Sequence, residues 1–175
     1  MNETLPTVYL LFLLLLLTAI AIFVIQQIFK TRKTESELSQ LQKKLKNEKG
    51  TALDYFQLGS IYLNKKLFAK ASQLFQRALK AEDDIEPENL AFIYNGLGYC
   101  YLSQEQYDLA IRQYKTALKH NPQFVKAINN LAYAYEKKQL TAQALETYEE
   151  ALKYEPENPT AKKRTESLRK RLVTS

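Results

Sequence analysis

The sequence predicts an all-α protein with an N-terminal transmembrane helix, an α-solenoid of three two-helix repeats and a C-terminal capping helix. Three observations indicate this fold class. Val8 to Phe29 carries no charge, a set of small and aromatic residues recurs three times, and Asn158 with Pro159 opens a basic C-terminal segment. Only four glycines interrupt these periodic segments, and no run of strand character competes with them.

The uncharged segment predicts a membrane anchor over residues 1–30. Its 22 residues, at about 1.5 Å per residue, are long enough to cross a hydrocarbon core of about 30 Å. A cleaved signal peptide is the alternative, because Ala19 and Ala21 resemble a small-residue cleavage site. No Lys or Arg precedes the segment, however, and the apolar run Ile22 to Ile25 follows the alanines, so a retained anchor is favoured.

Basic residues at the ends of the span predict its orientation. None precedes the span, whereas Lys30, Arg32 and Lys33 follow it directly. The positive-inside rule then places the repeats in the cytoplasm, or in the stroma of a plastid. The short N-terminal end, which contains Glu3, is expected on the lumenal side.

A helical linker is predicted over residues 31–50. Thr34 and Glu37 have the spacing of a capping box, and Gly50 is expected to end the helix. The apolar face of this helix consists of Leu38, Leu41 and Leu45. Two heptads are fewer than a coiled coil usually shows, so a homodimer through these leucines is possible but not favoured.

A recurring pattern divides residues 51–157 into three repeats, at about 52–85, 91–124 and 125–158. In the second repeat the pattern consists of Tyr94, Leu97, Gly98, Tyr101, Ala110, Tyr114, Ala117 and Pro122. A shift of 34 positions gives Ile128, Leu131, Ala132, Tyr135, Ala144, Tyr148, Ala151 and Pro156. A shift back by 39 positions gives Tyr55, Leu58, Gly59, Tyr62, Ala71, Phe75 and Ala78. Three copies at this period resemble a tetratricopeptide repeat (TPR) array, whose repeat is about 34 residues long.

Close packing of two antiparallel helices explains the pattern. Gly59, Gly98 and Ala132 are small enough to let the first helix of each repeat, helix A, approach the second, helix B. One repeat cannot bury its apolar face alone, so stability comes from stacking. The five residues inserted within Asp83 to Asn89 favour a longer surface loop, with a partner contact as the alternative. Helix A of the second repeat is expected from about Leu90.

Residues 159–175 are predicted to form the capping helix and tail. Asn158 is expected as N-cap and Pro159 as the first helical residue. The helix carries the basic residues Lys162, Lys163, Arg164, Arg169, Lys170 and Arg171. A terminal repeat needs a polar cover, so capping is the expected role; contact with anionic lipid is the alternative.

The composition argues against an enzyme, a metal site, a cofactor site or a nucleic-acid-binding protein. Cys100 and His120 are the only residues of their types, and no glycine-rich phosphate loop follows a strand. Cys100 is expected as a buried small side chain. The net charge is +6, but lysines and acids alternate along the helices, which favours a solvated surface over a basic stripe for nucleic acid.

The resemblance to TPR proteins implies a protein-binding groove on the concave side, lined by helix A. The ligand-facing positions fall on Leu53, Phe56, Ser60, Leu63 and Asn64, on Phe92, Asn95, Tyr99, Leu102 and Ser103, and on Lys126, Asn129, Tyr133, Glu136 and Lys137. We expect Asn95 and Asn129 to bond an extended backbone. Phe56 and Phe92 are as readily explained by internal packing, so Tyr99 and Tyr133 are the central candidates.

One TPR subfamily grips the C-terminal carboxylate of chaperones with lysine, asparagine and arginine, and this sequence departs from it. The clamp positions of the first repeat hold Phe56 and Ser60, and those of the later repeats hold Gly96 and Asn130. Lys126 alone fits the clamp. A chaperone tail is therefore a poor candidate for the ligand.

The similarity extends beyond the repeat pattern. The runs Gln104 to Tyr114 (QEQYDLAIRQY), Leu140 to Leu145 (LTAQAL) and Thr160 to Leu168 (TAKKRTESL), with the leucine-rich anchor and Lys30 to Glu35, resemble one family of cyanobacteria and algal plastids. This family consists of membrane-anchored TPR proteins associated with photosystem I assembly. The resemblance implies a thylakoid protein that holds photosystem I subunits. A general membrane-bound adaptor unrelated to photosynthesis is the alternative.

Overall fold

The computed structural model describes residues 4–81 and 85–174, and within these ranges every regular element is an α-helix. The all-α fold class is therefore confirmed. The chain divides into two units after Lys46, and each is described by itself. The helices are α1 (Thr4–Asn47), α2 (Ala52–Asn64), α3 (Phe68–Lys80), α4 (Pro87–Ser103), α5 (Tyr107–His120), α6 (Val125–Lys137), α7 (Thr141–Tyr154) and α8 (Pro159–Thr174).

The first unit is one continuous helix, α1, of 44 residues. The predicted capping box at Thr34 and Glu37 is wrong, because Thr34 lies inside the helix and its hydroxyl donates to the Lys30 carbonyl at 3.1 Å. Gly50 does not end the helix either: α1 stops at Asn47, and no glycine in the described residues has a positive φ. The predicted anchor and linker are thus parts of a single helix.

The N-terminal half of α1 carries large apolar side chains on all its faces. Those between Val8 and Phe29 are 46 to 70% exposed, and a continuous apolar surface of this kind is typical of a membrane or protein contact. The Thr18 hydroxyl donates to the Leu15 carbonyl at 2.9 Å, so this polar group is satisfied without water. By length and composition, the helix can cross a membrane.

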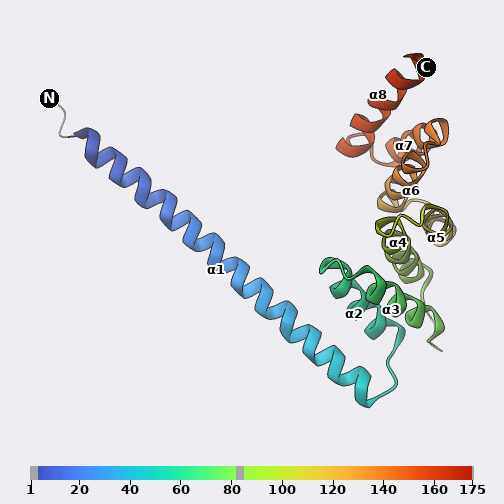
Figure 1. Cartoon of the computed structure of the whole chain (residues 1–175), viewed down its shortest axis with the longest axis horizontal. Helices are drawn as coiled ribbons and strands as arrows, with labels where there is room; N and C mark the ends of the chain where they lie inside the picture. Colours follow the sequence, from blue (N-terminus) through green and yellow to red (C-terminus); the bar gives the residue numbers. More distant parts are fainter. Residues whose placement is uncertain (1–3, 82–84, 175) are drawn as a thin grey trace. The chain divides into compact units, whose positions relative to one another are not determined.

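The second unit stacks its helices in chain order, so that each helix from α2 to α8 packs on the next (Figure 1). Helix pairs α2–α3, α4–α5 and α6–α7 form the three repeats. The turn inside each pair has one residue with φ near 60°: Lys66, Glu105 and Gln139. In the first pair, Leu67 N–H donates to the Tyr62 carbonyl at 2.9 Å, which is the long bond of a Schellman motif.

Helix α4 begins earlier than its counterpart in the third repeat. It starts at Pro87, within the segment Asp83 to Asn89 that was expected to be a loop. Proline suits the first turn of a helix because it lacks the N–H that would have no intrahelical partner there. Part of the insertion therefore adds a turn to α4. Residues 82–84, which include the start of the predicted loop, lie outside the described residues.

In the first two repeats a buried aromatic ring packs against glycine. Phe75 of α3 is fully buried, and a Cβ atom placed on Gly59 or on Gly96 would lie 2.9 or 2.8 Å from its ring. Tyr114 is equally buried, and a Cβ on Gly98 would lie 2.7 Å from its ring. These rings therefore set how closely neighbouring helices approach.

Helix α8 covers the end of the third repeat. The Asn158 side-chain oxygen accepts from the Ala161 N–H at 3.0 Å, which confirms the predicted N-cap. Ala161, Thr165 and Leu168 are buried along one face, on the side where α8 packs against α7. The helix thus closes the apolar end of the solenoid.

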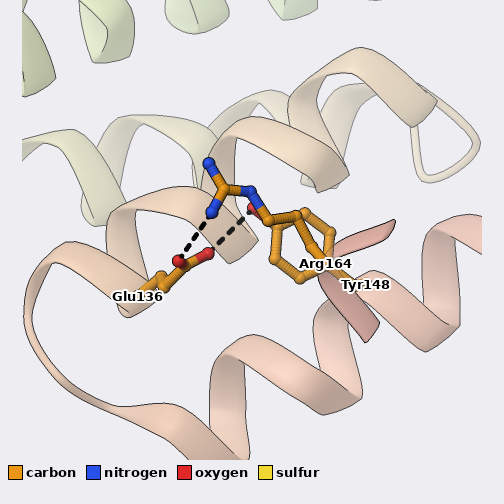
Figure 2. A network of polar contacts seen from close by, with 3 residues as sticks. All are labelled: Glu136, Tyr148 and Arg164. Atoms are coloured by element: carbon orange, nitrogen blue, oxygen red, sulfur yellow. Dashed lines mark hydrogen bonds and ion pairs between the residues drawn. The ribbon is translucent and has the colours of Figure 1, made fainter. Parts of the chain in front are cut away.

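A polar network joins α8 to α6 and α7 (Figure 2). Arg164 Nη1 lies 3.1 Å from Glu136 Oε1, and the Tyr148 hydroxyl lies 3.5 Å from Glu136 Oε2. Burial, with the Glu136 carboxylate as a second cause, raises the pKa of the Tyr148 hydroxyl. Tyr148 therefore stays protonated and can donate toward the carboxylate.

Gly98→Leu is expected to lower the free energy of unfolding by about 2–4 kcal/mol, because the buried Tyr114 ring has no space to move into. Ala132→Gly is the matched control at the same repeat position, and should cost only about 1 kcal/mol through lower helix propensity. Chemical unfolding of the full chain in detergent, followed by circular dichroism, measures both. Equal losses would contradict the packing argument.

Glu136→Ala is expected to lower the free energy of unfolding by about 1–2 kcal/mol, since Arg164 and Tyr148 both lose their shared acceptor. Asp108→Ala removes the partner of Lys138 in an ion pair whose carboxylate is far more exposed than that of Glu136, and should cost less than about 0.5 kcal/mol. The same unfolding measurement compares the two variants. An Asp108→Ala loss as large as that of Glu136→Ala would show that the network adds nothing to the docking of α8.

Candidate protein-binding groove

The A helices α2, α4 and α6 contact one another in series, so their matching faces lie side by side. Residues at i, i+3, i+7 and i+11 share one face of a helix. On α2 these are Leu53, Phe56, Ser60 and Asn64, on α4 Phe92, Asn95, Tyr99 and Ser103, and on α6 Lys126, Asn129, Tyr133 and Lys137. We call these twelve residues the groove set.

The α2 end of the groove set is apolar. Leu53 is 58% exposed, whereas Phe56 is half-buried with its ring centroid 5.9 Å from that of Phe75. Phe56 thus combines the two roles considered for it, internal packing and a partly open face. The Ser60 hydroxyl donates to the Phe56 carbonyl at 2.8 Å, so its proton is already engaged.

A pocket of about 380 Å³ opens beside Leu53 and Phe56. The insertion between the first two repeats supplies one wall through Ile85, Glu86 and Asn89. The remaining lining residues are Thr51, Ala52 and Ile93. This volume lies within the range of small ligand pockets and can hold a large apolar side chain.

The α4 part of the groove set exposes two aromatic rings. Phe92 is 38% exposed and meets Phe124 edge-on, with ring centroids 5.0 Å apart. Tyr99 is 42% exposed, and its ring lies 6.3 Å from that of Phe68 at the start of α3. Both rings are therefore supported from one side and accessible from the other.

The two asparagines expected to bond a ligand differ in their surroundings. Asn95 is 8% exposed, and its side-chain oxygen accepts from Asn130 Nδ2 at 2.9 Å. That oxygen therefore joins α4 to α6. The Asn129 side chain is half-buried, and its oxygen is buried without a hydrogen-bond partner among the described residues, so a ligand can reach that oxygen only after the amide turns outward.

Tyr133, predicted to be a central open residue, is half-buried against the core and has two cationic side chains near its ring. Lys137 Nζ is 5.4 Å from the centre of the Tyr133 ring, and the Arg164 guanidinium is 5.8 Å from it. A hydrogen bond to Tyr133 is the main cause that raises the pKa of Lys137, which therefore remains charged. Lys126 is exposed at the opposite end of the same helix face. The α6 part of the groove set is thus cationic.

The remaining reactive groups are engaged in packing. Cys100 is fully buried, and burial raises the pKa of its thiol to about 12. His120 stacks on Tyr94 with ring centroids 5.5 Å apart. Among the described residues, no three metal-ligating side chains come together. The groove set can therefore supply apolar contact, hydrogen bonds and positive charge.

Sequence reasoning missed several residues of this region. Arg164 reaches Tyr133 from α8, Asn130 bonds Asn95 across 35 positions, and Ile85 lines the pocket from the insertion. The sequence predicts Arg164 only as one of the basic residues of the capping helix. The one available signal was the five-residue insertion, which pointed to a feature that the other repeats lack.

Comparison with known proteins gives the family. The tetratricopeptide repeat family matches residues 50–123 and also residues 95–162. The first TPR domain of Spaghetti (RPAP3), solved with an HSP90 peptide, has a TM-score of 0.64 and 20% identity. The match covers 70% of this chain and 93% of that one, and it shows that the two share a fold.

Two curated relatives are more similar in sequence. The ycf37 protein of Cyanophora paradoxa is 41% identical over 127 residues, which are 73% of each chain. The chloroplastic TPR protein PYG7 of Arabidopsis thaliana is 35% identical over 122 residues, which cover 70% of this chain and 40% of that protein. The chain therefore belongs to the tetratricopeptide repeat family, and within it to the group of ycf37 proteins.

Proposed function

We propose that this protein is a non-enzymatic, membrane-tethered TPR scaffold that binds protein subunits and assists the assembly or stability of photosystem I. One observation carries the proposal: the chain joins an apolar helix, long enough to cross a membrane, to repeats whose groove set exposes Leu53, Phe92 and Tyr99. The resemblance of Gln104 to Tyr114 and of Thr160 to Leu168 to the photosystem I assembly family supports the choice of partner. The 35% sequence identity to the chloroplastic TPR protein PYG7 agrees with a role in plastids.

Val8 to Phe29 is the proposed anchor in the thylakoid membrane. Its side chains are exposed on every face, and lipid is the surrounding that makes such exposure favourable. Lys30, Arg32 and Lys33 hold the following part of the helix on the stromal or cytoplasmic side, with the N-terminus in the lumen.

Tethering makes weak contacts sufficient. A groove confined to a layer near the membrane meets membrane-bound subunits at a high effective concentration. Exposed rings such as Tyr99 and Phe92 offer apolar area, and an extended segment can add hydrogen bonds. A general adaptor unrelated to photosynthesis would use the same groove with another partner, so the identity of captured proteins separates the two functions.

The double variant Tyr99→Ala, Tyr133→Ala is expected to reduce capture of photosystem I subunits about tenfold, because it removes the exposed Tyr99 ring and the half-buried Tyr133 ring at the centre of the groove set. The measurement is affinity purification of the full-length protein from gently solubilised thylakoids, with partners quantified by mass spectrometry.

Tyr154→Ala is the matched control for this experiment, because Tyr154 is also 42% exposed but lies at the end of the B helix α7. It should leave capture unchanged. If the double variant captures as many photosystem I subunits as the wild type, the proposed function stands, but the groove set is not the binding surface. Capture of another complex, without photosystem I subunits, would replace the proposed function by the adaptor.

Protease added to intact thylakoid membranes is expected to digest the TPR unit without detergent, since the basic residues after Phe29 orient it outward from the lumen. The readout is loss of an epitope tag placed after Ser175. A lumenal protein of the same membranes provides the control for membrane integrity. Protection of the tag until detergent is added would reverse the orientation.

A further inference from the structure

The three parts of the groove set differ in chemistry along the solenoid. The α2 part presents Leu53 and Phe56 next to the 380 Å³ pocket, and the α4 part presents Phe92 and Tyr99. Neither part contains a charged residue. The α6 part differs, because lysines occupy both its first and its last position.

The positive charge at the α6 end is only partly compensated. Lys126 is exposed and forms no ion pair among the described residues. Lys137 is also exposed, and it interacts with the Tyr133 ring and, at longer range, with Tyr107 and the carboxylate of Glu105. Arg164 is shared with Glu136, so its charge is balanced by that carboxylate.

The buried oxygen of Asn129 lies on the same helix face, between Lys126 and Tyr133. It has no hydrogen-bond partner among the described residues, although buried amide oxygens normally have one. Because the Asn129 side chain is only half-buried, its amide can turn toward the open face, where a backbone N–H of a bound segment would supply the missing donor. The site thus offers positive charge at both ends of one helix face and an acceptor between them.

Building on the proposed function, we infer that the groove set binds an extended protein segment that has acidic residues over α6 and large apolar residues over α2 and α4. The apolar end enters the pocket beside Leu53 and Phe56, and carboxylates lie near Lys126 and Lys137. Neighbouring helices are about 8–10 Å apart, so the distance from α2 to α6 is about 20 Å. An extended chain covers this distance with about six residues.

The charge pattern distinguishes this ligand from a polyanion. A nucleic acid or a similar backbone carries charge along its whole length and requires cations throughout its binding surface. The groove set has cations only at α6, while its α2 and α4 parts are uncharged. A segment with an apolar end and an acidic end matches the uncharged α2 and α4 parts and the cationic α6 part.

Two fluorescein-labelled ten-residue peptides test this inference with the full-length protein in non-ionic detergent. One has phenylalanine and leucine in its first half and glutamate in its second, and the other has lysine in place of glutamate. Their apolar halves are identical, so partition into micelles affects both equally. Fluorescence anisotropy should show at least tenfold tighter binding of the acidic peptide, and this preference should shrink in high salt.

The double variant Lys126→Glu, Lys137→Glu should weaken binding of the acidic peptide at least tenfold and strengthen binding of the basic one. The matched control is Lys119→Glu, Lys153→Glu, which reverses two exposed lysines in the last turns of α5 and α7. Its affinities should stay within twofold of the wild type, and circular dichroism verifies the fold of both variants.

The inference is overturned if the wild type binds neither peptide or both equally, or if the reversal at Lys126 and Lys137 changes nothing. The proposed function is judged separately, by the photosystem I subunits captured from thylakoids. Those subunits can be captured while the peptide preference is absent, in which case the scaffold stands and only the chemistry of its ligand is wrong.

Discussion

Buried aromatic rings pack against glycines, and this contact determines how the repeats are arranged. Phe75 fills the space between Gly59 and Gly96, and Tyr114 packs onto Gly98 in the same way. Interiors are close-packed, so these contacts fix the distance between helices A and B. The direction in which each A helix presents its exposed face follows from that distance. The groove set is therefore a consequence of packing on the opposite side of the same helices.

Much of the fold could be predicted, because the residues that pack within each repeat recur at fixed, short spacings in the sequence. The Asn158 cap and the B helices follow from such short-range signals. The capping box at Thr34 was misleading, since a threonine inside a helix can bond the carbonyl four residues back, as Thr34 does to Lys30. No glycine or proline lies between Phe29 and Thr34, and this indicates the continuous helix better than the capping-box spacing does. The early start of α4 was missed because the acidic insertion had suggested a loop.

The candidate site was predictable only where it depends on helix periodicity. The face that carries Tyr99 and Tyr133 follows from the repeat register, but the state of each side chain depends on distant residues. Asn95 is engaged because Asn130 of the next repeat reaches it, and Arg164 reaches Tyr133 because α8 docks where it does. Such contacts join residues about thirty positions apart, and no local pattern encodes them. Burial and pairing therefore required the three-dimensional structure.

The continuity of α1 makes its C-terminal part a spacer of defined length. Lys30 to Asn47 contributes 18 residues, or about 27 Å of rigid helix beyond the apolar segment. The two ends of a flexible linker would lie at many different distances from each other, whereas a helix fixes both the distance and the relative orientation of its ends. If Val8 to Phe29 spans the membrane as proposed, the repeats begin beyond about 27 Å of helix that follows the apolar segment. Such a spacer would add a geometric requirement to the choice of partner.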